Sequence, residues 1–182
     1  MEVKGLEFPG YEPRGNYGMG LAYATSERGA CHLRAYTVYH PNPFDLDAMT
    51  KEVISHQHRL AVKSSLIFCF FLHSVNVDEM AQILNIGMGE ELYSGEDLWK
   101  VGERIWNLGR LFNIKSGLEM KDDNLPDRVF EEGLLNGPHQ GRTLSQEDFS
   151  MMLRNYYRDR GWDIYGHPKK EKLEELEVDI PW

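Results

Sequence analysis

The sequence predicts an all-α fold, a multi-helical, irregular bundle whose helices are joined by long Gly/Pro-rich connections. Several segments carry apolar residues at the three- and four-residue spacing of a helix, and helix-capping side chains stand before them. No segment shows the sustained alternation of apolar and polar residues that predicts strands. With 182 residues, of which 41% are hydrophobic and 12% aromatic, the chain is long enough to form a core, and we treat residues 1–182 as one helical region.

The N-terminal stretch predicts an irregular loop followed by two helices. Residues 8–20 read FPGYEPRGNYGMG, and two prolines with four glycines in this short run preclude a regular helix. From about Met19 the composition suits a helix, Gly29 interrupts it, and a second helix is expected through ACHLRAY. Pro41 and Pro43 then break the chain.

A long helix is expected after this break. Asp45 or Asp47 can cap it, and it runs through AMTKEVISHQHRLAV toward Cys69. Beyond it, Asn76 and Glu79 have the spacing of a capping box. They open a short helix through MAQILNI that the following glycines close.

The most regular apolar pattern stands behind a second capping pair, Ser94 and Asp97. After an irregular stretch over about 117–142, Ser145 can cap a last major helix that Gly161 ends. A short charged helix, KKEKLEEL, is expected from Pro168. The regular pattern itself has spacings of three, four, three and four and predicts a helix through Leu98, Val101, Ile105, Leu108 and Phe112.

The charge balance excludes several classes of partner. A formal net charge of −9 without a basic patch disfavours nucleic acid and anionic membrane surfaces, which bind clustered Lys and Arg. The longest strongly apolar run, about residues 65–72, is far shorter than the roughly 20 residues of a membrane-spanning helix. The polar N-terminus lacks a signal-peptide pattern, so a cytoplasmic protein is expected.

The cysteine content is too low for a self-sufficient metal or disulfide site. Cys31 and Cys69 are the two cysteines of the sequence. They give neither a disulfide framework nor a closed metal centre, because a four-coordinate zinc ion or a cubane cluster needs further ligands.

Three stretches could carry chemistry, and each also has a purely structural interpretation. The first is PRGNYGMG, whose glycine N–H groups and Arg14 could bind phosphate. No strand precedes it, so it is neither a P-loop nor a dinucleotide-binding fingerprint. The alternative is an ordinary connecting loop.

The second stretch, SERGACHLRAY, gathers Arg28, Cys31, His32 and Arg34 at the expected helix break. A helix N-terminus after Gly29 and the two arginines would suit an anionic ligand. A neutral His32 in that setting could exchange a proton near physiological pH. The alternative is a satisfied polar break with an inert buried cysteine.

The third stretch, SSLIFCFFL, places Cys69 among Phe68, Phe70 and a further phenylalanine. Such a cysteine is either an inert core residue or a thiolate ligand to an iron–sulfur cluster, which also favours dry, bulky surroundings. One cysteine does not separate these two readings. His56 and His58 form a weaker candidate metal site, because alternate residues of a helix face different directions.

Long runs of the sequence resemble one enzyme family. The run VKGLEFPGYEPRGNYGMGLAYATSERGACHLRAY resembles the corresponding stretch of aldehyde ferredoxin oxidoreductases almost without interruption, and VKSSLIFC resembles the family's Asp-Ser-Leu-Gly-Leu-Cys motif. GEDLWKVGERIWNLGRLFNIKSG, DDNLPDRVFEEGL and NYYRDRGWDIYGHPKKEKLEEL resemble its late helix, a following loop and its closing segment. The resemblance covers nearly the whole chain. It implies the C-terminal helical domains, of the domain 2 and 3 type, that close over a tungsten bis-pterin site in an N-terminal domain absent from this sequence.

The resemblance also implies roles for eight residues. Cys69 occupies the place of the fourth ligand to a [4Fe-4S] cluster, whose other ligands come from a cysteine-rich segment upstream. His32 matches an active-site histidine that assists proton movement near tungsten. The residues that match pterin contacts are Arg28, Gly29, Arg34, Ser64, Phe68 and Phe70.

The implied reaction oxidises an aldehyde to a carboxylic acid with a water-derived oxygen, and two electrons leave through the cluster to ferredoxin. The implied partners are an N-terminal pterin domain or subunit, ferredoxin and the aldehyde, while a homo-oligomer and the choice of tungsten or molybdenum stay open. A chain with one cluster ligand of four is expected to hold no cofactor and to be inactive alone. The alternative is a non-catalytic helical interaction or assembly module derived from the family.

The sequence departs from the family pattern at the cluster motif. Ser64 stands where the family has Asp, and a serine hydroxyl accepts fewer hydrogen bonds than a carboxylate and brings no charge. Ile67 and Phe68 replace a Gly-Leu pair. Met1 directly precedes sequence that falls in the middle of family members, as expected of an expressed fragment or of a short gene whose product pairs with a separate pterin subunit.

Overall fold

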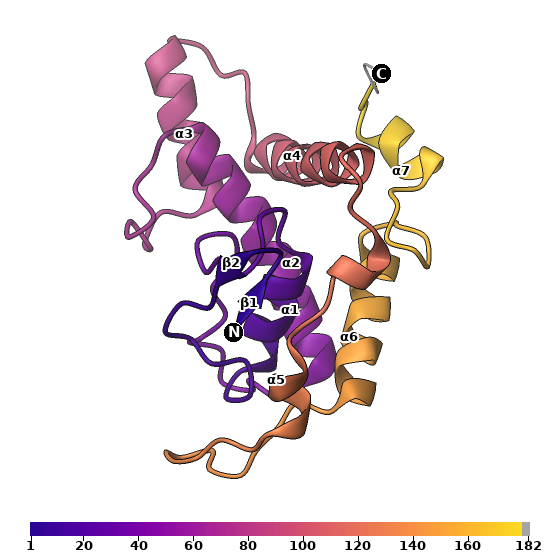
Figure 1. The fold of residues 1–182 in the computed structure, drawn as a ribbon. Helices are drawn as coiled ribbons and strands as arrows, with labels where there is room; N and C mark the ends of the chain where they lie inside the picture. Colours follow the sequence, from indigo (N-terminus) through magenta and orange to yellow (C-terminus); the bar gives the residue numbers. More distant parts are fainter. Residues whose placement is uncertain (180–182) are drawn as a thin grey trace.

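The computed structural model describes residues 1–179 and confirms the mainly helical class. A two-stranded antiparallel hairpin precedes the helices (Figure 1). None of the helices in the described range is long and apolar enough to cross a membrane. In chain order the elements are β1 (Glu2–Val3), β2 (Leu6–Glu7), α1 (Tyr17–Thr25), α2 (Leu46–Ser65), α3 (Val77–Met88), α4 (Gly95–Lys115), the 3-10 turn η1 (Met120–Asp122), α5 (Asp127–Glu131), α6 (Gln146–Asp159) and α7 (Lys170–Glu175).

Helix α2 is the element around which the others are arranged. It contacts α1, α3, α4 and α6, while α1 also contacts α6 and α3 also contacts α4. Figure 1 shows the N-terminal hairpin and α1 beside the lower part of α2, and α4 crossing near its upper end. The C-terminal end of α2 therefore lies where the two halves of the chain meet.

The four predicted helix starts are confirmed. Asp45 accepts a hydrogen bond of 2.9 Å from the backbone N–H of Ala48, and Ser145 caps α6 in the same way. Complete capping boxes open α3 at Asn76 and α4 at Ser94. The last helix begins two residues later than predicted, because the segment around position 168 pairs with Trp162 in an isolated bridge.

The predicted second helix through ACHLRAY is wrong, and with it the helix N-terminus expected after Gly29. Residues 32–34 form a turn instead, and residues 31, 35 and 36 have no regular secondary structure. Their backbone is held by distant side chains: the N–H of Tyr36 donates to Nδ1 of His56 at 3.1 Å, and Asn16 donates from its amide to the carbonyl of Thr37 at 3.0 Å. These tertiary bonds replace the local bonds of a helix. Arginines alone therefore supply positive charge in this segment.

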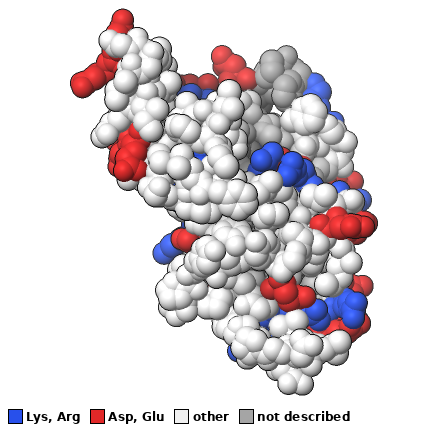
Figure 2. Space-filling model, turned by 90° about the vertical axis from the view of Figure 1, so that its left-hand side faces the viewer, with Lys and Arg blue, Asp and Glu red and all other residues white. Residues whose placement is uncertain are grey.

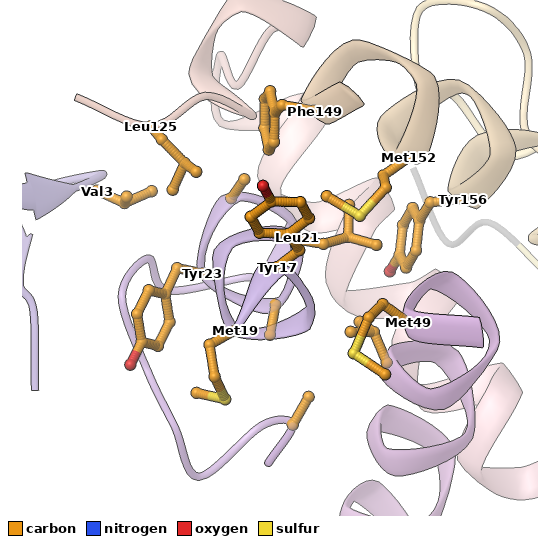
Figure 3. Packing of buried hydrophobic residues seen from close by; sticks show 14 of the residues in the cluster. Val3, Tyr17, Met19, Leu21, Tyr23, Met49, Leu125, Phe149, Met152 and Tyr156 are labelled. Atoms are coloured by element: carbon orange, nitrogen blue, oxygen red, sulfur yellow. The ribbon is translucent and has the colours of Figure 1, made fainter. Parts of the chain in front are cut away.

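The main core surrounds α1, in which every residue is buried. Met19, Leu21 and Tyr23 of α1 pack among apolar side chains from α2, α6 and the hairpin (Figure 3). A Cβ on Gly18 would meet the side chains of Thr37 and Met49 at closer than contact distance, so glycine permits this close approach. Helix α1 thus lies at the centre of the main core.

A second apolar cluster attaches α3 to the ends of α2 and α4. Its buried members are Val62, Val77, Met80, Ala81 and Leu98. Phe68 packs against this cluster from the loop that follows α2. The cluster therefore fixes one side of that loop.

Asp123 joins four parts of the chain through its buried carboxylate, which is 1% exposed. It accepts from Nζ of Lys4 in the hairpin turn at 2.7 Å and from Nη1 of Arg110 in α4 at 2.8 Å. The hydroxyl of Tyr157 in α6 donates to it at 2.6 Å. Lys4 also donates to the backbone carbonyls of Ala24 and Ser26 at the end of α1.

We predict that Asp123→Asn destabilises the chain by about 3–5 kcal/mol. The substitution keeps the shape of the side chain but leaves the buried cations Lys4 and Arg110 without their charge partner. Urea unfolding followed by circular dichroism measures the change. The matched substitution Asp159→Asn removes a surface partner of Arg158 and should cost under about 1 kcal/mol; equal effects of the two substitutions would contradict the central role of Asp123.

The backbone at Ile67, just beyond α2, has a positive φ of 60°. A β-branched residue is strained in this left-handed region, which glycine enters freely. The side chain is 91% exposed and so gains little from packing. The Gly of the resembling family motif stands at this position.

Ile67→Gly is accordingly expected to stabilise the chain by roughly 1 kcal/mol through relief of this strain. Ile86→Gly is the control, because Ile86 is equally well exposed but lies inside α3, where glycine should destabilise by about 1 kcal/mol. Thermal or urea unfolding of the two variants should shift in opposite directions. A loss of stability in Ile67→Gly would mean that the loop gains more from Ile67 than its backbone loses.

Candidate functional site

Two segments far apart in the sequence meet beside the C-terminal end of α2. The ring of His32 lies 6.3 Å from that of Phe70, edge to face, and 5.2 Å from that of Tyr11. Tyr36 packs on Phe70 as well, at 5.8 Å between ring centroids. The structure therefore brings the predicted catalytic histidine next to the loop that carries Cys69.

Cys69 is exposed on this loop, and a buried lysine shapes the loop from beneath. Lys63 is 4% exposed, and its ammonium group donates to the backbone carbonyls of Phe70 at 3.0 Å and Leu72 at 2.6 Å. Burial, with the nearby charge of Arg59, lowers the pKa of Lys63, whereas Cys69 acts to raise it. The loop conformation thus presents the thiol outward while a cation remains close to it.

The surroundings of His32 favour its neutral form. Burial lowers the pKa of His32 below its usual value, and the positive charge of Arg28 lowers it further. Arg28 is exposed, and its guanidinium donates to Sγ of Cys31 at 2.8 Å. A neutral imidazole near an exposed arginine can accept a proton from a bound group.

Arg34 and Ser64, two of the predicted pterin contacts, line the same cavity of about 290 Å³ between α2 and α4. Its wall combines apolar side chains with polar and charged ones. Its remaining lining residues are Glu27, Leu60, Ala61, Ser65, Ile105, Trp106 and Gly109.

Glu27 is the residue of this cavity that the sequence analysis missed. Its Oε1 accepts from Nε of Arg34, and its backbone carbonyl accepts from the side-chain amide of Asn113 at 2.6 Å. Its Oε2 is buried and has no hydrogen-bond partner. A lone acidic residue among the arginines of SERGACHLR was the only available signal.

Gly29 and Phe68 have structural roles that account for their identity. Gly29 has a φ of 92°, and a Cβ there would overlap the carbonyl oxygen of Val3 in the hairpin. Phe68 packs on the second apolar cluster. Their contact with a pterin stays a prediction.

Arg14 of the glycine-rich stretch is buried and fully engaged by the protein. Its guanidinium forms a two-bond ion pair with Glu12, each bond 2.9 Å long, and donates to the carbonyl of Glu132 at 2.7 Å. Asn16 of the same stretch caps α1. These contacts support the structural interpretation of PRGNYGMG.

His56 and His58 point to different surroundings. His56 pairs with Glu52 at 3.1 Å on the surface side of α2. His58 accepts a hydrogen bond from the fully buried guanidinium of Arg160. Burial and the charge of Arg160 lower the pKa of His58 to about 2, so this ring is a neutral acceptor inside the core.

The donor set fits one ligand of a larger metal centre. Among residues 1–179, no three His, Cys, Asp or Glu side chains gather in a way that could hold a metal ion. Cys69 is an exposed thiol beside a cation, which suits a soft thiolate ligand. A cluster at this position would require three ligands from outside the described residues.

Comparisons with known proteins show the family of this chain. The family model described as "Aldehyde ferredoxin oxidoreductase, domains 2 & 3" matches residues 1–178. The chain is 41% identical to a tungsten-containing aldehyde ferredoxin oxidoreductase of Pyrococcus furiosus and 40% identical to one of Thermococcus kodakarensis. Each match covers 98% of this chain and 31% of the relative, so the chain spans about a third of the length of these relatives.

More distant similarities show the reach of the fold. The chain is 27% identical to a protein of Pyrococcus furiosus named aliphatic sulfonate oxidoreductase, WOR-like subunit, over 98% of its length and 28% of the relative. The structure of the active-site complex BamBC of benzoyl coenzyme A reductase aligns with a TM-score of 0.61 and 23% identity. That match covers 76% of this chain and 20% of the other and shows a shared fold. The chain thus belongs to the aldehyde ferredoxin oxidoreductase family and corresponds to its domains 2 and 3.

Proposed function

We propose that this chain forms one wall of the cofactor site in an enzyme that oxidises aldehydes to carboxylic acids with ferredoxin as electron acceptor. The observation that carries the proposal is the convergence of His32, Arg34, Ser64 and the Cys69 loop beside the end of α2. The names of the tungsten-containing relatives support the metal and the reaction class.

Cys69 would supply one thiolate to a [4Fe-4S] cluster. The geometry supports this role because the thiol is exposed while the loop around it is held by Lys63. When bound, a tungsten bis-pterin centre with this cluster supplies two-electron oxidation and passes the electrons on singly. The chain itself contributes a preset ligand and a nearby positive charge.

His32 would move one of the two protons that oxidation of an aldehyde by water releases. Its imidazole is neutral at physiological pH because burial and Arg28 both disfavour the charged form. The ring is held by Tyr11 on one side and by Phe70 of the cluster loop on another. A ring fixed in this way can accept a proton without reorienting.

The remaining predicted contacts would hold the pterin. Arg28 and Arg34 supply positive charge to an anionic cofactor, and Ser64 offers a hydroxyl at the wall of the cavity. Phe70 would shield the cluster from water. Gly29 and Phe68 would shape the backbone beside it.

The rest of the enzyme would cover the face that carries the cluster loop. Figure 2 shows that this side of the molecule has few charged side chains over its middle. Tyr39, Ile67 and Phe71 are exposed by 82%, 91% and 78%, and such apolar exposure marks an interaction surface. An N-terminal pterin domain or subunit is the partner we infer, and without it the chain would be inactive.

Within the holoenzyme that contains this chain, Cys69→Ser is expected to abolish or alter the electron paramagnetic resonance signal of the [4Fe-4S] cluster, because serine is a poorer ligand to iron than cysteine. Cys31→Ser is the matched control, since Cys31 is buried and bonded to Arg28. The cluster signal of Cys31→Ser should be normal.

The same preparations separate the enzyme from a non-catalytic assembly module. A normal cluster signal in Cys69→Ser would refute the ligand assignment. Stoichiometric tungsten and about four iron atoms per isolated chain would refute the need for a partner. Recovery of the chain from its source without any cofactor-bearing polypeptide would favour the module.

The protonation of His32 gives a test that needs no cofactor. Arg28→Gln should raise the pKa of His32, because one of its two causes of lowering is removed. Titration of the imidazole C–H resonances by nuclear magnetic resonance measures this. Arg59→Gln should leave the value unchanged.

The pH dependence of turnover follows from the protonation of His32. Since the neutral imidazole accepts the proton, turnover should fall as pH drops through the pKa of His32, and Arg28→Gln should move this fall to higher pH. A pKa of His32 at or above 6.5 in the unsubstituted chain would contradict the assignment.

A further inference from the structure

A pocket of about 370 Å³ lies between α6 and the segment that follows it, residues 162–169, and we call it the α6 pocket. Three of its lining residues are the cations Arg154, Arg158 and Lys169, although the chain as a whole has a formal net charge of −9. Figure 1 shows α6 and this segment on the opposite side of the molecule from the loop that follows α2. The α6 pocket is therefore separate from the candidate site described above.

The two arginines of the α6 pocket stand one helical turn apart, and like charges at this spacing repel each other. The guanidinium of Arg158 donates to Oδ1 of Asp159 at 2.8 Å and to Oδ1 of Asn155 at 3.0 Å. Within residues 1–179, the side chain of Arg154 has no hydrogen-bond or ion-pair partner. A bound anion would relieve the repulsion and give Arg154 a partner.

Asp163 supplies the carboxylate among the described residues that line the α6 pocket, and its own turn engages it. Its Oδ1 accepts hydrogen bonds from the backbone N–H groups of Tyr165 and His167, each at 2.9 Å. The carboxylate therefore stabilises the turn, and the pocket keeps an excess of positive charge.

Lys169 departs from the usual sequence preferences of a helix start. It is the N-cap residue of α7, but its side chain makes no capping hydrogen bond. Ser, Thr, Asp and Asn are favoured at an N-cap, and a positive charge at a helix N-terminus is unfavourable. Departures from such local rules are expected at functional sites. The position of Lys169 is fixed, because its backbone N–H donates to the carbonyl of Gly161 at 3.1 Å.

The remaining lining of the α6 pocket is apolar and held in place by the backbone. Tyr157, Trp162 and Ile164 supply this surface. Trp162 pairs with Pro168 in the isolated bridge, and its backbone N–H donates to the carbonyl of Tyr157 at 2.8 Å. A ligand would therefore meet a surface that is already ordered, which lowers the entropic cost of binding.

We propose that the α6 pocket binds a small carboxylate ion that carries an apolar body. The guanidinium of Arg154 offers two parallel N–H donors to a carboxylate, and Lys169 adds a second positive charge. The apolar body packs on Trp162 and Ile164, and its removal from water favours binding. The volume of the pocket lies in the range of small-molecule sites, roughly 300–1,000 Å³. This binding site goes beyond the proposed function, which uses none of these residues.

Three small ligands separate the contributions of charge and apolar contact. Benzoate and benzamide share a ring and nearly the same shape, but only benzoate is charged, whereas acetate has the charge without the ring. Ligand-observed nuclear magnetic resonance on the 182-residue chain should show saturable binding of benzoate. Its affinity should exceed those of benzamide and acetate at least about tenfold each, the size of one hydrogen bond to a charged group or of one apolar ring contact.

Two results with these ligands would overturn the inference. Equal affinities for benzoate and benzamide would mean that the pocket does not recognise the charge. No detectable binding of benzoate at millimolar concentration would mean that the pocket is not a site for this class of ligand. Tighter binding of inorganic phosphate than of benzoate would also overturn it, because phosphate gains nothing from an apolar surface.

Arg154→Gln should lower the affinity for benzoate at least about tenfold and leave the affinity for benzamide unchanged. Arg154 is exposed, so the variant should keep the fold. Arg128→Gln on α5 is the matched control, because it removes the same charge from an exposed helical arginine outside the pocket. Equal losses in the two variants would show a general effect of net charge and contradict the proposal.

A charge placed inside the pocket gives an independent variant. Ile164→Asp should abolish benzoate binding, because it sets a carboxylate against the ligand and removes part of the apolar surface. Leu135→Asp is the control, since Leu135 is also an exposed apolar residue but lies outside the pocket. Unchanged benzoate binding in Ile164→Asp would mean that the ligand binds elsewhere on the chain.

Discussion

The ion pairs of Asp123 hold the site together from a distance. Because Lys4 bonds both Asp123 and the last carbonyls of α1, the carboxylate determines where α1 ends and the segment with Glu27 begins. Arg110 bonds the same carboxylate, and Asn113, one turn further along α4, bonds the carbonyl of Glu27. Two separate chains of contacts therefore run from one buried charge to one wall of the cavity.

The local features of the fold could be predicted from the sequence, and the distant ones could not. The capping box of Asn76 and Glu79 is complete within four residues, so its geometry is encoded locally. The segment ACHLRAY has helical composition, but its backbone is fixed by His56, twenty residues away. Tertiary bonds overrode propensity there, as they commonly do in short segments.

The candidate site shows the same division. The resemblance of SSLIFC and SERGACHLRAY to family motifs drew attention to His32 and Cys69, and the structure brings their segments together. No sequence pattern indicates that Lys63 is buried or that Oε2 of Glu27 has no hydrogen-bond partner. Burial of the Glu27 carboxylate depends on neighbours such as Asn113, which is 86 residues away from Glu27 in the chain.

The hydrogen bonds that Lys63 donates to the loop carbonyls have a consequence for cofactor assembly. A flexible loop would lose conformational entropy when its thiolate met iron, and the affinity of the site would fall by that amount. Here folding has already ordered the backbone around Cys69 through the bonds to Phe70 and Leu72. Under the role proposed for Cys69, metal binding at this thiolate would therefore carry a small ordering penalty, and its rate would depend on the arrival of the remaining ligands.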